Sequence, residues 1–136
     1  MKPLVLDTNV LIRFLERGGD YAEIFSKFDR LLIPAAVDGE YRAGVDAATR
    51  PGQRRQKAFD ALLESSAVEY VPAGREVSSE YAKVFRHLQE RGTPIPQNDI
   101  WIAATALVRH APLCTLDDHF KNVEALELIS LQGGRV

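Results

Sequence analysis

The sequence predicts an α/β fold, in which a parallel β-sheet is covered by helices on both faces. Short apolar runs, such as residues 4–6 and 113–116, alternate along the chain with longer stretches of helical spacing. These runs are continuously apolar, which is typical of strands that are buried on both faces. The connectors are short, and strands that alternate with helices favour parallel strand–helix–strand units.

Length and composition predict a single domain spanning residues 1–136. A chain of 136 residues buries roughly two-thirds of its unfolded surface, and no repeat, low-complexity segment or linker divides it. No apolar stretch approaches the roughly 20 residues that span a bilayer, so we expect no membrane partner. Cys114 is the lone cysteine and lies in an apolar run, which favours a core position and a cytoplasmic protein.

The first half of the chain is expected to hold three strands and four helices. Thr8 or Asn9 caps the first helix, Asp20 caps the second, and Pro34 leads into the third. The sequence Arg-Pro-Gly-Gln at 50–53 predicts a break before the fourth. The expected strands are 4–6, 30–33 and 68–71, and the expected helices are 10–16, 21–28, 35–48 and 54–64.

The second half begins with a long amphipathic helix at 75–91, which ends at Gly92. Pro94 and Pro96 predict an extended connector at 93–97. Asn98 and Asp99 then open a helix at 100–109 that is apolar nearly all round, so we expect it to be central. The last elements are strands at 113–116 and 126–131, separated by one helical turn at 119–122.

Acidic residues follow two of the expected strands. Asp7 comes directly after the strand at 4–6, and Asp117 directly after the strand at 113–116. Because the carboxyl ends of parallel strands meet at one edge of the sheet, these two carboxylates should share that edge, where α/β proteins bind their ligands. Glu40 and Asp99 stand at helical positions from which they reach the same edge.

Four carboxylates in one crevice repel one another, and at least one would retain its proton. Divalent cations remove this cost, and Mg²⁺ or Mn²⁺ prefers oxygen ligands. Two such ions about 3.5–4 Å apart clamp the attacking and leaving oxygens of a phosphodiester. Taken singly, Asp99 or Asp117 is as compatible with a helix cap as with a site acid, and Glu40 is typical of a solvated helix residue. Taken together, the four favour a metal site.

Four blocks in order resemble a known family. The resemblance covers nearly the whole chain, and the blocks resemble those of PIN-domain ribonucleases and, among them, of the VapC toxins of bacterial and archaeal toxin–antitoxin pairs. It implies a three-layer α/β/α domain whose five parallel strands stand in the order 3-2-1-4-5. The strands preceding Asp7 and Asp117 are then neighbours at the point where the order reverses. The blocks are residues 5–11, 37–44, 98–104 and 115–120.

The resemblance also implies an activity. It implies an Mg²⁺- or Mn²⁺-dependent endoribonuclease that uses a metal-bound water as nucleophile and leaves 5′-phosphate and 3′-hydroxyl ends. It further implies a toxin that is neutralised by a cognate VapB-like antitoxin, and a homodimer. The catalytic and metal-binding acids would be Asp7, Glu40, Asp99 and Asp117, with Thr8, Asn9 and Thr115 as supporting polar residues and Asp118 as an extra carboxylate beside Asp117.

The densest basic cluster is Arg50, Arg54, Arg55 and Lys57. Two interpretations stay open: a solvated helix face, or a rim that contacts RNA phosphates. The formal net charge of −2 does not by itself indicate a nucleic-acid binder. With the four site carboxylates set aside, however, the rest of the chain carries a net positive charge.

Some side chains near these motifs are open to more than one use. His119 is expected to pack or to cap a turn, because hard cations favour oxygen ligands and no His-rich spacing surrounds it. Trp101 is expected in the core or at a subunit interface. The apolar residues of the first two helices serve either the core or a groove for a partner helix; they are Leu15, Ile24, Phe25 and Phe28.

Two other functions compete with the nuclease. One is a non-catalytic module of the same fold that binds RNA or protein, which an incomplete set of acids would favour. The other is a phosphatase or phosphoacceptor domain that uses Asp7 as nucleophile. Such phosphatases usually carry a second Asp two residues later, and position 9 is Asn.

Overall fold

The computed structural model describes residues 2–131. This part of the chain holds five strands, six α-helices and one short 3-10 helix. In chain order they are β1 (Pro3–Leu6), α1 (Thr8–Glu16), α2 (Gly18–Phe25), β2 (Arg30–Pro34), α3 (Ala35–Gly44), α4 (Arg50–Glu64), β3 (Val68–Val71), α5 (Arg75–Glu90), α6 (Gln97–Val108), β4 (Leu113–Thr115), η1 (Asp118–Asn122) and β5 (Leu128–Ser130).

The five strands form one parallel sheet in the order β3-β2-β1-β4-β5, which confirms the expected order. β1 is the central strand: Val5 pairs with Leu32 of β2 on one side and with Leu113 of β4 on the other. Leu4 and Leu6 are inaccessible to solvent, as is Val5. A strand that is buried on both faces is the physical reason for the continuously apolar run at 4–6.

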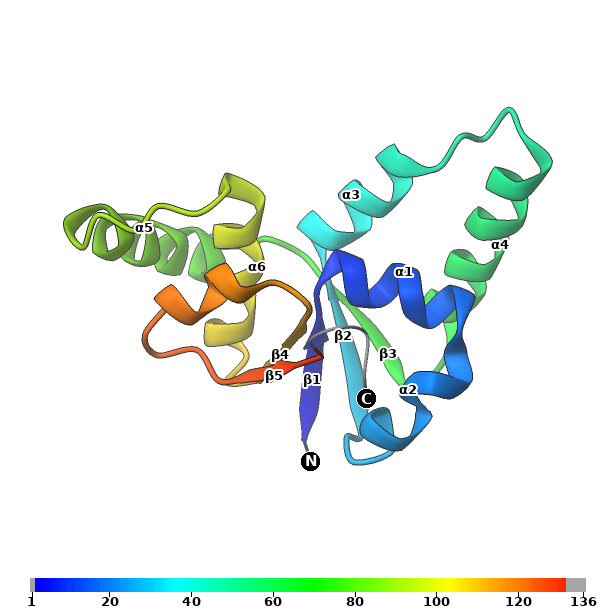
Figure 1. The fold of residues 1–136 in the computed structure, drawn as a ribbon, viewed down its shortest axis with the longest axis horizontal. Coiled ribbons are helices and arrows are strands. Elements are labelled where there is room, and N and C mark those ends of the chain that lie inside the picture. Colours follow the sequence, from blue (N-terminus) through cyan, green and yellow to red (C-terminus); the bar gives the residue numbers. More distant parts are fainter. Residues whose placement is uncertain (1, 132–136) are drawn as a thin grey trace.

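Helices cover both faces of the sheet, as the alternating pattern predicts. Figure 1 shows α1 to α4 on one side of the central strands and α5, α6 and η1 on the other. This is the arrangement that right-handed crossovers produce when the strand order reverses at β1. α6 packs against α5 and is buried along most of its length, as its apolar sequence predicts. Within residues 2–131, no helix is long and apolar enough to cross a bilayer.

Two helix boundaries near the site differ from expectation because of capping side chains. α1 begins at Thr8 rather than at residue 10, since the Asp7 carboxylate accepts a hydrogen bond from the Thr8 N–H. α4 begins at Arg50 rather than at residue 54, because the Thr49 hydroxyl accepts from the Gly52 N–H at 3.1 Å. Pro51 lies in the first turn of α4, where its missing N–H costs no intrahelical bond. The expected break at 50–53 was therefore wrong, and α3 ends at Gly44, four residues early.

Other boundaries shift by a few residues. α2 spans Gly18–Phe25, so Asp20 lies in its first turn and Arg17, not Asp20, is the N-cap residue. α6 begins at Gln97, directly after Pro96. A proline is accepted at the start of a helix, because the N–H that it lacks would have no partner within the helix. β4 ends at Thr115 instead of 116, which places Asp117 two residues beyond the strand.

Candidate active site and metal centre

One cavity of about 480 Å³ lies at the carboxyl edge of the sheet. All four predicted acids line it, although they come from four separate parts of the chain. Asp7 follows β1, Glu40 belongs to α3, Asp99 lies in the first turn of α6, and Asp117 follows β4. The other lining residues are Thr8, Asn9, Pro96, Gln97, Asn98 and His119.

Asp7 is the most buried of these acids, with 3% of its surface exposed. Its Oδ1 accepts from the Thr8 N–H at 2.8 Å, and its Oδ2 accepts from the Thr115 hydroxyl at 2.7 Å. Burial raises the pKa of Asp7 to about 6, and the neighbouring charges of Asp99 and Asp117 act in the same direction. A charged Asp7 is therefore costly unless a cation lies nearby.

The hydroxyl groups of two threonines hold the acids in position relative to one another. Thr8 Oγ1 donates to Glu40 Oε1 at 2.7 Å and so joins the start of α1 to α3. Thr115 Oγ1 donates to Asp7 and accepts from the Asp117 N–H at 2.9 Å. Thr8 and Thr115, expected as supporting residues, hold the backbone and side chains of the acids in position. Asn9 lines the cavity beside them.

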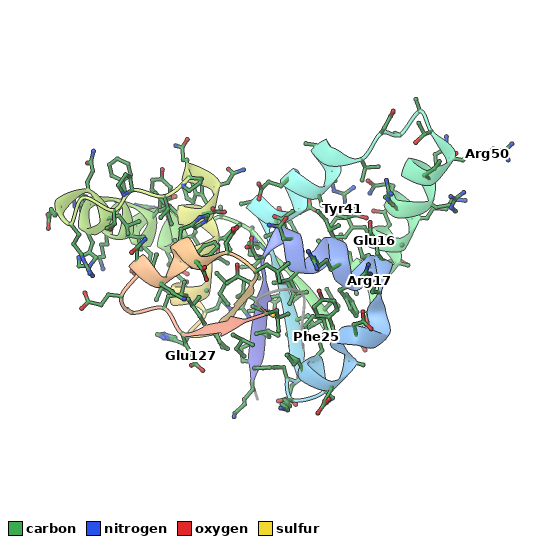
Figure 2. All side chains as sticks on the ribbon, viewed as in Figure 1. Glu16, Arg17, Phe25, Tyr41, Arg50 and Glu127 are labelled. Atoms are coloured by element: carbon green, nitrogen blue, oxygen red, sulfur yellow. The ribbon has the colours of Figure 1, made fainter. Side chains whose placement is uncertain are left out.

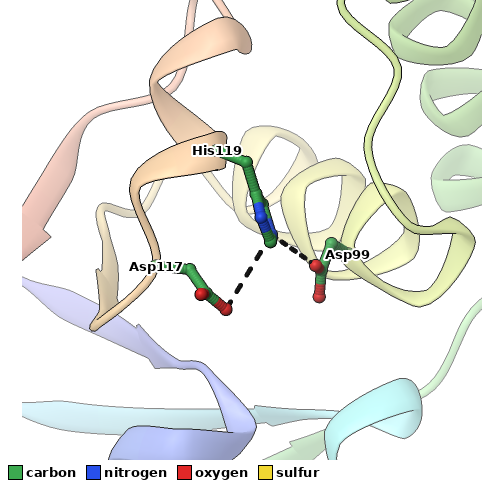
Figure 3. Close-up of side chains that lie close together, drawn as sticks. All are labelled: Asp99, Asp117 and His119. Atoms are coloured by element: carbon green, nitrogen blue, oxygen red, sulfur yellow. Dashed lines mark hydrogen bonds and ion pairs between the residues drawn. The ribbon is translucent and has the colours of Figure 1, made fainter.

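Asp99, Asp117 and His119 point toward one another (Figure 3). His119 Nε2 lies 2.5 Å from Asp99 Oδ2 and 3.8 Å from Asp117 Oδ2. One ligand atom from each residue lies within 4.8 Å of the others, a grouping that is able to hold a metal ion. The pKa of Asp99 is raised by burial first and then by Asp117 and Glu40, while the hydrogen bond from His119 opposes the shift.

His119 is the site residue that the sequence did not predict. It was expected to pack or to cap a turn, but its ring lies in the cavity against two carboxylates. The available signal was its place two residues after Asp117, within a predicted helical turn. η1 returns the chain toward the cavity, and Phe120, which is fully buried, anchors the turn.

Asp118 takes no part in this cavity. Its side chain is 67% exposed and pairs with Lys121 at 3.4 Å. The carboxylate that faces the other acids is that of Asp117, which lies 3.8 Å from His119 Nε2. The geometry therefore distinguishes between the two neighbouring acids.

A second cavity of about 480 Å³ lies between α1, α3 and α4 and shares Glu40 with the first. Arg54 and Arg55 line it, together with apolar side chains such as Leu15. Arg50 and Lys57 line neither of these two cavities. Figure 2 shows Arg50 at the end of α4 far from the strands, with its side chain directed outward. The predicted basic cluster thus divides into two residues that line a cavity shared with Glu40 and two that line neither cavity.

The four apolar residues for which a core position or a groove was expected pack in or against the core. Phe25 is buried, and Leu15, Ile24 and Phe28 are partly buried and pack against the core. Leu15 also contributes to the second cavity. Cys114 is fully buried, as expected, and burial raises the pKa of its thiol to about 12.

Trp101 is half-buried in α6. Its ring stacks on Tyr81 of α5 with 4.2 Å between centroids. Next to this pair, 40% of the Phe85 side chain is exposed. Trp101 therefore helps to join the two helices.

The donor atoms of the first cavity fit a divalent cation. Among the ion pairs within residues 2–131, no Lys or Arg neutralises Asp7, Glu40, Asp99 or Asp117. Carboxylate and amide side chains make up most of the lining, and their oxygens suit a hard ion such as Mg²⁺ or Mn²⁺. Burial raises the pKa of the Asp7 carboxyl, so a cation beside it would favour the charged form of this acid.

Comparisons with known proteins agree with this arrangement. The PIN domain family matches residues 4–126. Ribonuclease VapC5 of Mycobacterium tuberculosis is 34% identical over 128 residues, which cover 93% of this chain and 92% of that protein. Ribonuclease VapC of Rickettsia bellii is 30% identical over 94% of this chain and 96% of its own.

Solved structures lead to the same group. The chain resembles the VapBC-5 toxin–antitoxin structure of Mycobacterium tuberculosis with a TM-score of 0.73 and 29% identity, covering 96% of this chain and 99% of that one. It resembles VapBC-1 of nontypeable Haemophilus influenzae with a TM-score of 0.81 and 26% identity, covering 94% and 97%.

Proposed function

Because this chain belongs to the PIN-domain family, in the branch of the VapC ribonucleases, we propose that it is a metal-dependent endoribonuclease. The observation that carries the proposal is the single cavity that gathers Asp7, Glu40, Asp99 and Asp117. The relatives are named ribonucleases, which supports RNA as the substrate.

The catalytic ion would be Mg²⁺ or Mn²⁺, and Asp7, Glu40, Asp99 and Asp117 would hold it. When bound, such an ion lowers the pKa of a coordinated water and offsets the charge that develops on the phosphate. The protein's own part is positional. Thr115 holds the Asp7 carboxylate toward the cavity, and Thr8 holds Glu40. Asn9 lines the cavity with an amide that is able to bond a phosphate oxygen.

RNA reaches this cavity along the neighbouring face of α4. Arg54 and Arg55 line the adjoining cavity, so they contact the phosphates nearest to the cleaved bond. Arg50 and Lys57 extend the positive charge along the same helix toward more distant phosphates. Such contacts weaken as the salt concentration rises, without any dependence on base sequence.

The protein acts as the toxin of a toxin–antitoxin pair. Two of the similar structures are described as VapBC structures, one of them as a member of a family of toxin–antitoxin systems. We therefore assign this chain a cognate VapB-like antitoxin, a homodimeric assembly and a cytoplasmic location, where its RNA substrate is found.

The activity is tested with Asp7→Asn and Asp99→Asn. Each variant should lower the rate of cleavage of a metal-supplied RNA substrate by about a hundredfold or more, because an amide binds a divalent ion much more weakly than a carboxylate. Burial raises the pKa of Asp7, so replacing its charge should leave the melting temperature in EDTA at pH 7.5 unchanged or higher. The matched control is Asp20→Asn, an exposed position in the first turn of α2.

Full cleavage activity in both site variants would overturn the proposal. Binding of RNA that persists in EDTA, with no cleavage at any concentration of Mg²⁺ or Mn²⁺, would indicate a non-catalytic binding module instead. A phosphorylated Asp7 trapped from the protein would indicate phosphoryl transfer to that side chain.

A further inference from the structure

We propose that His119 is a nitrogen ligand of the divalent ion and that it makes the site prefer Mn²⁺ to Mg²⁺. The inference rests on the proposed metal-dependent function and concerns how that function selects its ion. It starts from the position of His119 Nε2, which faces Asp99 and Asp117 across the same cavity (Figure 3).

The spacing of these three side chains suits one shared ion. Around an octahedral ion with bonds of about 2.1 Å, adjacent donor atoms lie about 3.0 Å apart and opposite ones about 4.2 Å apart. His119 Nε2 lies 3.8 Å from Asp117 Oδ2, which falls between these values. His119 Nε2 is hydrogen-bonded to Asp99 Oδ2 at 2.5 Å, so for both atoms to bind one ion Nε2 would present its lone pair and this contact would lengthen by about half an ångström.

The turn that carries His119 makes this small change feasible. Phe120 is inaccessible to solvent and anchors η1 in the core. The His119 side chain itself is 32% exposed and lines the cavity, so its ring is able to rotate without disturbing the core. The backbone thus fixes where the imidazole lies, while the ring adjusts by tenths of an ångström.

The chemistry of the donor atom determines the preference. Mg²⁺ takes oxygen ligands and retains several waters, so an imidazole nitrogen adds little to its binding. Mn²⁺ also favours oxygen, but it belongs to the first-row series of ions that mixed nitrogen and oxygen sites bind, at the weak end of that series, so it gains more from an imidazole nitrogen than Mg²⁺ does. A cavity of carboxylates alone would treat the two hard ions similarly. The added nitrogen of His119 shifts the balance toward Mn²⁺.

Electron spin-echo spectroscopy of the Mn²⁺-loaded protein tests the bond directly. A coordinated imidazole should produce a ¹⁴N modulation in the unmodified protein, and that modulation should be absent from His119→Gln. It should persist in His110→Asn. His110 is an exposed histidine beyond the other end of α6, with φ at 52°, a backbone conformation that asparagine accepts.

Calorimetric titration with each ion tests the selectivity. The amide oxygen of His119→Gln reaches to about where Nε2 lies and offers oxygen in place of nitrogen. We expect the dissociation constant for Mn²⁺ to rise about tenfold and that for Mg²⁺ to change by less than about threefold. His110→Asn should change neither.

The possible outcomes distinguish a failure of this inference from a failure of the proposed metal-dependent function. One outcome is that the unmodified protein binds Mn²⁺ and Asp99→Asn does not, but the bound Mn²⁺ shows no nitrogen modulation. This outcome would overturn the role of His119 as a ligand and leave the metal-dependent function standing. Equal losses of Mn²⁺ and Mg²⁺ affinity in His119→Gln would overturn the selectivity. The absence of any saturable Mn²⁺ binding would overturn both the inference and the proposed metal dependence.

Discussion

Thr115 connects two of the acids through its hydroxyl group. Its hydroxyl donates to Asp7 and accepts from the Asp117 N–H, so one side chain connects two acids from neighbouring strands. It is fully buried, and water cannot replace the bonds that it makes. Loss of a partner for a buried polar group costs about 1–3 kcal/mol.

Replacing Thr115 with valine keeps the volume and removes the hydroxyl. Thr115→Val should lower the free energy of unfolding by about 1–3 kcal/mol, because Asp7 Oδ2 and the Asp117 N–H lose their partner. RNA cleavage should fall at the same time, since both acids gain freedom to move. Urea unfolding and a cleavage assay measure the two effects. Thr115→Ser, which keeps the hydroxyl, should restore most of the activity, and a valine variant as stable and as active as the unmodified protein would contradict the assignment.

Individual residues also show how much of the site could be predicted from the sequence. Asp7 and Asp117 could be predicted because each follows an apolar run, and a parallel sheet brings such ends together. The bond between Thr8 and Glu40 joins residues 32 apart, and that between Asp7 and Thr115 joins residues 108 apart. Such pairings depend on side-chain directions that no local pattern encodes. His119 was missed for the same reason, because the path of η1 decides where its ring points.

At the start of α4, the sequence pattern predicts a different local structure from the one that forms. Pro51 and Gly52 resemble a break, yet they form the first turn of the helix under the Thr49 cap. Gly52 is required by close packing, since a Cβ at this position would lie 1.8 Å from the carbonyl oxygen of Asp46. The glycine therefore allows the segment between α3 and α4 to fold back against the helix that carries Arg54 and Arg55.

Gly52→Ala should consequently destabilise the protein by at least about 2 kcal/mol, because a backbone carbonyl must move away from the added methyl group. Gly39→Ala in α3 is the matched control. A Cβ there meets nothing within 4 Å, and alanine favours a helix, so we expect a gain of about 0.5–1 kcal/mol. Denaturant unfolding of both variants measures the contrast. Equal stabilities of the two variants would show that the loop before α4 adapts freely.

The far end of α6 is held by an ion-pair cluster. Glu69 of β3 accepts from Arg109 at 2.7 and 3.0 Å, and from Arg30 of β2 at 3.2 Å. The hydrogen bonds from Arg109, more than any other contact, hold the pKa of Glu69 below its ordinary value of 4.5. The cluster links the end of α6 to two strands.

This lowered pKa predicts a dependence of stability on pH. The contribution of Glu69 is present above the pKa of the unfolded chain and is lost as the pH falls through the lower pKa of the folded state. Glu69→Gln should therefore cost up to about 1 kcal/mol at pH 7, a modest value because the side chain is partly exposed. The difference between variant and unmodified protein should shrink below about pH 4. Thermal unfolding at both pH values measures it, and a difference that does not change with pH would exclude the ion pair as its source.

The topology of the whole molecule explains why four distant acids share one cavity. The reversal of strand order at β1 places β4 beside it, and α3 and α6 approach the same edge from opposite faces of the sheet (Figure 1). The apolar runs of the sequence predict the parallel sheet itself. The strand order came only from the family resemblance, because periodicity does not show which strands are neighbours. The cavity beside Arg54 and Arg55 could not be predicted from the sequence either, because it forms only where α1, α3 and α4 meet.

Binding of the divalent ion should stabilise the entire domain. The folded state alone gathers Asp7, Glu40, Asp99 and Asp117, so the ion binds that state in preference to the unfolded chain. At a concentration one hundred times its dissociation constant, Mn²⁺ should add about 2.7 kcal/mol and raise the melting temperature by several degrees in one cooperative transition. Asp99→Asn should abolish most of this gain. Glu69→Gln, which removes a carboxylate outside the cavity, should keep it when each variant is compared with its own metal-free form. A gain of the same size in Asp99→Asn would place the stabilising ion somewhere other than the cavity.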